Sequence, residues 1–173
     1  MSADSVDNLL IQWGEQRPGL NMESLGVAVR VNRLGALWDR TAEDALAQLG
    51  LTLWEYDVLS ALRRQGPPFQ LPATRLARAT LISTGAITNR VDRLVDKGLV
   101  TRERDSHDRR AVIVRLSRDG LSLVHRAVEA RVAVADASLE SLSNKDREVL
   151  ARLLRILLSG VEHDIAELDT PTS

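Results

Sequence analysis

Residues 81–116 read LISTGAITNRVDRLVDKGLVTRERDSHDRRAVIVRL, and this stretch decides the fold. In its first half Ile87, Val91 and Leu94 recur at helix spacing, so one stripe of a helix over residues 82–97 faces inward. Lys97 and Gly98 close that helix, with a cation in the last turn and a glycine just past the end. Two short extended runs, 99–104 and 111–116, flank the polar turn DSHDRR. The stretch therefore predicts a helix followed by a β-hairpin.

This order of elements suits the reading of double-stranded DNA. A helix can enter the major groove, and a hairpin tipped with Arg109 and Arg110 can reach an adjacent groove or phosphates. Residues 71–116 hold ten Lys and Arg against five Asp and Glu, so this segment carries +5 in a chain whose net charge is −1. A local basic patch indicates a surface for phosphates, although arginines that only solvate a helix face would give the same count.

The composition of the whole chain suits one domain of ordinary size. Its 173 residues are 44% hydrophobic but only 3% aromatic, so we expect an aliphatic core. No apolar run reaches the ~18 residues that span a bilayer, and the N-terminus lacks the features of a signal peptide. The chain has no Cys, which excludes disulfides. We expect a cytoplasmic protein.

The rest of the chain is predicted to be mainly helical. A short amphipathic helix is expected over residues 5–14 and a long one over residues 22–49. Thr52 and Glu55 form a capping box that opens the next helix. Pro72 suits the first position of a helix over residues 71–80. Further helices are expected over residues 120–142 and from Ser143 onward.

The last predicted helix carries a long apolar stripe. Its members are Val149, Leu150, Leu153, Leu154, Leu157, Leu158, Val161 and Ile165. This stripe is too apolar for a lone surface helix, so it belongs either to an intramolecular core or to a dimer interface.

The segment resembles the winged helix-turn-helix of the MarR family of bacterial transcription regulators. The family's wing signature is Asp-x-Arg, a strand, then Leu-Thr-x-x-Gly; this chain has Asp108, Arg110, Leu116, Ser117 and Gly120. The resemblance spans roughly residues 9–165. It implies a mainly α fold with a small β wing, assembled as a homodimer through the N- and C-terminal helices. The expected parts of this one integrated fold are residues 1–50 on the ligand and dimer side, 51–118 for DNA binding and 119–173 for dimerisation.

The resemblance also implies the contacts with a double-stranded DNA operator. Thr84, Thr88 and Asn89 would read base edges or nearby phosphates, and Ser83 would hold a phosphate near the helix start. The wing arginines would lie in the minor groove or against its phosphates. The full predicted set is Ser83, Thr84, Thr88, Asn89, Arg93, Arg109 and Arg110.

Four further residues resemble the ligand set of the family's urate-responsive subgroup (the PecS/TamR-like regulators). They are Trp13, Asp57, Arg90 and Arg102. An anionic, planar purine such as urate suits a guanidinium and an indole face. We expect an Asp57–Arg90 pair in the free protein, which the purine would disrupt. Each residue also has a plain structural interpretation: Trp13 as a helix anchor, Asp57 with Arg90 as an ion pair, and the arginines as phosphate contacts.

Enzyme chemistry is not indicated. The three His residues have no metal-ligand spacing, and no nucleophile–base constellation or phosphate-binding loop is visible. No cofactor or metal is expected. The alternatives left open are a repressor with a phenolic or other lipophilic effector, and a winged helix that serves as a protein-interaction module.

Overall fold

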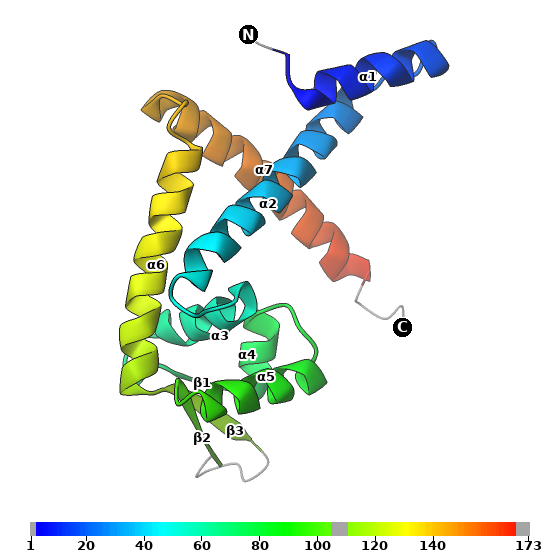
Figure 1. Ribbon diagram of the computed structural model, residues 1–173. Helices are drawn as coiled ribbons and strands as arrows, with labels where there is room; N and C mark the ends of the chain where they lie inside the picture. Colours follow the sequence, from blue (N-terminus) through cyan, green and yellow to red (C-terminus); the bar gives the residue numbers. More distant parts are fainter. Residues whose placement is uncertain (1–2, 105–110, 169–173) are drawn as a thin grey trace. The chain divides into compact units, whose positions relative to one another are not determined.

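The computed structural model describes residues 3–104 and 111–168 (Figure 1). In chain order the elements are α1 Ser5–Gln16, α2 Glu23–Ala47, α3 Leu53–Arg63, β1 Gln70–Pro72, α4 Ala73–Ala79, α5 Thr84–Asp96, β2 Val100–Arg104, β3 Val112–Leu116, α6 Arg118–Ser138 and α7 Asn144–Leu168. The chain divides into two compact units, Met1–Val134 and Ala135–Ser173. The mainly helical fold with a small sheet is confirmed.

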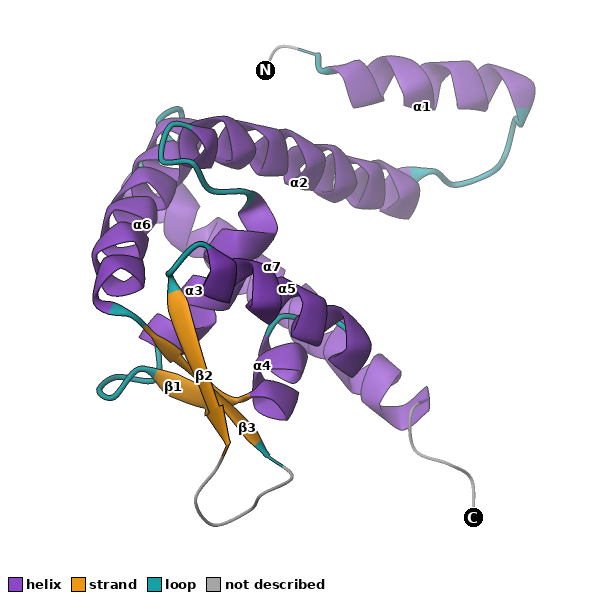
Figure 2. Ribbon diagram, turned by 60° about the horizontal axis from the view of Figure 1, so that its bottom comes forward, coloured by secondary structure: helices purple, strands orange, loops and turns teal. Residues whose placement is uncertain are grey.

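The core of the first unit lies among α3, α4, α5 and a three-stranded sheet. The sheet is antiparallel in the order β1-β3-β2 (Figure 2). Each of the three helices contributes a fully buried side chain, namely Leu59, Leu76 and Leu94. The sheet contributes the buried side chain of Val114. Leu46, near the C-terminal end of α2, joins the same aliphatic cluster. These contacts fix α5 and the β2–β3 hairpin on a common base.

One predicted element was wrong in its detail. Helix formation was expected from residue 71, with Pro72 in the first turn, but residues 70–72 form β1 and pair with β3. Pro72 ends this strand and is the N-cap residue of α4. A three-residue strand is too short to show a period in the sequence, and its partners lie more than forty residues further along.

The joint between β3 and α6 explains the Leu-Ser-x-x-Gly signature. The Ser117 hydroxyl donates to the Gly98 carbonyl oxygen at 2.7 Å and accepts from the Gly120 amide at 2.9 Å. A Cβ atom at residue 120 would lie 1.9 Å from the Leu99 carbonyl oxygen. The joint therefore needs a hydroxyl at 117 and no side chain at 120. Both a serine and the family's threonine can supply that hydroxyl.

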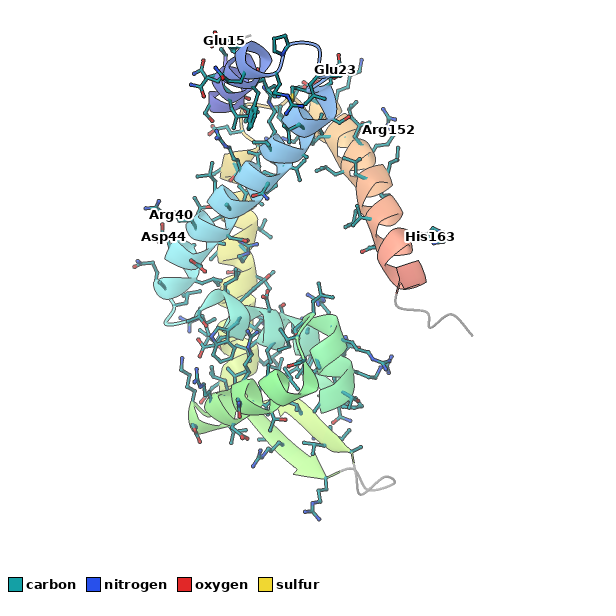
Figure 3. The ribbon with its side chains drawn as sticks, turned by 90° about the vertical axis from the view of Figure 1, so that its right-hand side faces the viewer. Glu15, Glu23, Arg40, Asp44, Arg152 and His163 are labelled. Atoms are coloured by element: carbon teal, nitrogen blue, oxygen red, sulfur yellow. The ribbon has the colours of Figure 1, made fainter. Side chains whose placement is uncertain are left out.

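The N-terminal helix packs on the N-terminal half of α2. Asp4 caps α1, and its carboxylate joins that of Asp7 on the Arg30 guanidinium of α2. Hydrogen bonding to Arg30 lowers the pKa of Asp4 to about 2. Along the rest of α2, polar residues such as Arg40 and Asp44 project outward (Figure 3). The ion-pair network thus holds α1 against residues 26–33.

The second unit consists chiefly of α7. Ser143 caps this helix by accepting from the Asp146 amide at 3.2 Å. Arg147 donates to the carbonyl oxygens of Leu139 and Leu142, which ties the turn after α6 to the start of α7. Three residues of the predicted apolar stripe, Leu153, Leu157 and Leu158, are about half exposed or more in the single chain.

Two features that the described residues lack bear on alternative functions. None of the helices there is long and apolar enough to cross a membrane. In the same part of the chain, no group of three His, Asp or Glu side chains is arranged to hold a metal ion.

Candidate nucleic-acid interface

The helix α5 has one buried face and one polar face, as predicted. Ile87, Val91 and Leu94 are buried to 3% exposure or less. The Ser83 hydroxyl caps the helix by accepting from the Ala86 amide at 3.3 Å. That cap fixes the point where α5 begins and leaves its first backbone amides at the surface.

The opposite face of α5 presents polar side chains to solvent. Thr88, Asn89 and Arg93 are exposed there, and Ser83 is exposed at the helix start. The side chain of Thr84 lies outside the described set. This face has the donors and acceptors that base edges and phosphates require.

Both ends of α5 are tied to the core. At the C-terminal end, the Lys97 ammonium lies 2.5 Å from the Glu55 carboxylate of α3. Burial raises the pKa of Glu55, but hydrogen bonds from Lys97 and from the Thr52 amide outweigh it and leave the pKa below its usual value. At the N-terminal end, the Ile82 amide donates to the Ala77 carbonyl oxygen at 3.1 Å. Both ends of α5 are therefore held in place by contacts with the core.

The β2–β3 hairpin runs beside α5 (Figure 2). Arg102 on β2 forms an ion pair with Asp92 of α5, which joins the hairpin to the helix. Arg102 and Arg104 both expose their side chains. The predicted contacts Arg109 and Arg110 lie outside the described residues.

Two exposed cations on α4 were missed by the sequence interpretation. Arg75 and Arg78 are both solvent-exposed on this short helix directly before α5. Their spacing of three residues places them on one helix face, which was the available signal. They extend the basic surface beyond α5 and the hairpin.

The expected Asp57–Arg90 ion pair is absent. In the described chain no ion pair joins these two residues. The Arg90 guanidinium instead lies over the Trp54 ring, 5.3 Å from its centroid. Trp54 is on α3 three residues before Asp57, so it offers an aromatic face on the side of α3 from which Arg90 approaches.

Asp57 is nevertheless the centre of a charged cluster. It keeps solvent access, yet the protein atoms packed around its carboxyl raise its pKa. The charges of Arg131, Arg90 and Arg64 act in the opposite direction, and that of Asp39 raises the pKa further. The positive charges of arginines at the end of α3, on α5 and on α6 therefore all favour the ionised form of this one carboxylate.

Within one chain, Trp13 lies away from Asp57 and Arg90. Trp13 is 48% exposed on α1, which is anchored to residues 26–33 of α2. The core around α3 begins near Leu46, about 20 Å or more along the axis of α2 at ~1.5 Å per residue. Asp57 and Arg90 are neighbours of Trp54, whereas Arg102 is engaged with Asp92.

The helix α5 buries one face and exposes the other, a hairpin adjoins it, and exposed cations extend the surface. These features define a DNA-binding protein of the winged helix-turn-helix class. Comparison with known proteins identifies its family. Residues 49–111 match the profile of the MarR family. The chain is 31% identical over 149 residues to the HTH-type transcriptional regulator PecS of Dickeya dadantii, covering 86% of this chain and 90% of that protein.

A second relative agrees in its role, and a solved structure agrees in its fold. The HTH-type transcriptional repressor NicR of Pseudomonas putida is 32% identical over 113 residues, which are 65% of this chain and 70% of that one. The MarR family regulator Sco3205 of Streptomyces coelicolor, solved in complex with DNA, superimposes with a TM-score of 0.73 at 23% identity, covering 83% of this chain and 91% of that chain. The chain therefore belongs to the MarR family and is a DNA-binding transcriptional regulator. It is not an enzyme.

Proposed function

We propose that this protein is a repressor that binds a pseudo-palindromic operator as a homodimer and is released by a small anionic purine such as urate. The observation that carries the DNA-binding part is the polar face of α5. Thr88, Asn89 and Arg93 are exposed there, while the opposite face is locked into the core. Repression is the activity named for NicR. Because the target is chromosomal DNA, the proposed location is the cytoplasm.

Within this proposal, α5 reads sequence and the wing adds affinity. Asn89 is assigned to a base edge, because an amide can pair with adenine through two hydrogen bonds. Arg93 and the predicted contacts Ser83, Thr84 and Thr88 complete the α5 surface. Arg109 and Arg110 are assigned to the minor groove or its phosphates. Twofold symmetry of a dimer implies two half-sites in the operator.

The experiment that tests this assignment compares Asn89→Ala and Arg110→Ala. Binding to an operator and to single-base variants is measured by fluorescence anisotropy over a salt series. Arg110→Ala should weaken binding to all sequences and reduce the slope of log affinity against log salt by about one unit. Asn89→Ala should change the preference among sequences. If Arg110→Ala binds like the wild type at every salt concentration, the wing assignment is wrong.

The effector part of the proposal rests on the charged cluster around Asp57. An anionic purine offers negative charge to the surrounding arginines and ring N–H groups to a carboxylate. Asp57 and Arg90 are proposed as its contacts, and Trp13 and Arg102 stay predicted contacts. Single alanine variants at the four positions, titrated with urate by calorimetry, test each one. Unchanged urate affinity in a variant removes that residue from the site.

The two alternatives differ in measurable ways. If the natural effector is phenolic, a phenolic acid such as salicylate would release the operator at least as effectively as urate. A protein-interaction module would show no salt-dependent DNA binding.

A further inference from the structure

The exposed face of α5 that is proposed to read DNA carries a carboxylate. Asp92 follows Thr88 by four residues and Asn89 by three, so the three side chains lie on one face of the helix. The side chain of Asp92 is 44% exposed. A carboxylate repels the phosphates of DNA and lowers the affinity for any sequence. Its presence on this face therefore needs a compensating interaction.

The hairpin supplies a cation that offsets this charge. Arg102 on β2 lies opposite the buried Val114 of β3, so its side chain leaves the sheet on the core side, where α5 packs against β2. The Arg102 Nη1 donates to the Asp92 Oδ1. This ion pair offsets the charge of the carboxylate, yet 44% of the Asp92 side chain and 51% of the Arg102 side chain stay exposed.

One oxygen of Asp92 is available to a further donor. Its Oδ1 accepts from Arg102, and among the residues that the structure describes none donates to its Oδ2. A carboxylate has lone pairs for about four hydrogen bonds. In the major groove, the exocyclic N4 amine of cytosine is the base-edge donor that suits an aspartate. Thymine presents the O4 acceptor instead, which a carboxylate would repel.

We propose that Asp92 is a specificity-determining residue, which accepts a hydrogen bond from the N4 amine of a cytosine in each operator half-site. In this arrangement Arg102 holds the carboxylate in place and offsets its charge. The inference rests on the proposed reading of DNA by α5 and deepens it, because it names a base edge and a residue outside the predicted contact set.

The position of this cytosine follows from the geometry of the helix. Asn89 and Asp92 are separated by ~4.5 Å along the axis of α5, which is close to the ~3.4 Å rise between base pairs. An amide suits adenine and a carboxylate suits cytosine. We therefore expect the cytosine within one or two base pairs of the adenine assigned to Asn89.

The test uses duplexes that the intact protein selects from a library with a random central segment. In a selected duplex each base pair is exchanged in turn, in both half-sites, and binding is measured by fluorescence anisotropy. For the wild type, exchange of one particular cytosine for thymine should weaken binding by about tenfold or more. In Asp92→Ala the difference at that position should fall below about threefold, because the carboxylate that thymine O4 repels is gone.

Two further variants separate base reading from the fastening of the hairpin. Arg102→Ala removes the same ion pair but keeps the carboxylate, so it should weaken binding to all duplexes and retain the preference for cytosine. Asp96→Ala is the matched control, because it removes an exposed carboxylate one turn further along α5. It should leave the preference at every position unchanged.

The outcomes distinguish this inference from the proposed function. An unchanged preference for cytosine in Asp92→Ala contradicts the inference alone. Loss of that preference in Arg102→Ala as well contradicts it too, because the ion pair and not a base contact would then carry the effect. A selected half-site in which no cytosine affects binding has the same meaning. Failure of the wild-type protein to select any sequence contradicts the proposed operator reading and this inference with it.

Discussion

Gly120 lies where no larger residue fits. The Leu99 carbonyl oxygen occupies the position that a Cβ atom would take, and the Gly120 amide is fixed by the Ser117 hydroxyl. The wing strand β3 runs directly into this joint. The lack of a side chain at Gly120 therefore fixes the direction in which α6 continues from β3.

Gly120→Ala should lower the free energy of unfolding by about 3 kcal/mol, because backbone must move to admit the methyl group. Gly35→Ala is the matched control. It lies mid-helix in α2 with nothing within 4 Å of the added Cβ, so it should raise stability by up to ~1 kcal/mol. Urea unfolding followed by circular dichroism measures both. Equal stability of Gly120→Ala and wild type would refute the steric account of this joint.

At the scale of elements, the attachment of α5 was partly visible in the sequence. Its buried stripe and the Thr52–Glu55 capping box follow from local spacing, and both are confirmed. Strand β1 and the Arg90–Trp54 contact were missed, because each depends on packing between segments distant in sequence.

Because of the Glu55–Lys97 ion pair, we expect the stability of the fold to depend on pH. The pKa of Glu55 is lowered in the folded protein, so its stabilisation is full above the ordinary value of 4.5 and is lost as the pH falls through the lowered value. Glu55→Gln keeps an oxygen for the Thr52 amide but removes the charge. It should cost about 2 kcal/mol at pH 7, and less as the pH falls below the ordinary value.

Chemical unfolding between pH 3 and pH 7 measures that difference. Glu129→Gln, at an exposed position on α6, is the control and should change stability little at any pH. A Glu55→Gln deficit that stays constant down to pH 3 would mean that the ion pair does not stabilise the fold.

At the scale of the whole molecule, the proposed dimer depends on the apolar surface of α7. Leu153, Ile156 and Leu158 are about half exposed or more in the single chain. Truncation before Ser143 removes α7 and should convert a dimer to a monomer with much weaker operator binding, because each half-site alone provides few contacts. Sedimentation measures this directly. A truncated protein that is still dimeric would refute α7 as a dimer element.

The most direct test of the account is release of a labelled operator from the intact protein by urate, beside salicylate at equal concentration. We expect urate to weaken operator binding by about 5-fold to 150-fold, the range of a typical allosteric coupling. Salicylate should have little effect, and Asp57→Ala should lose the urate response. An equal response to both compounds, or a full urate response in Asp57→Ala, would contradict the account.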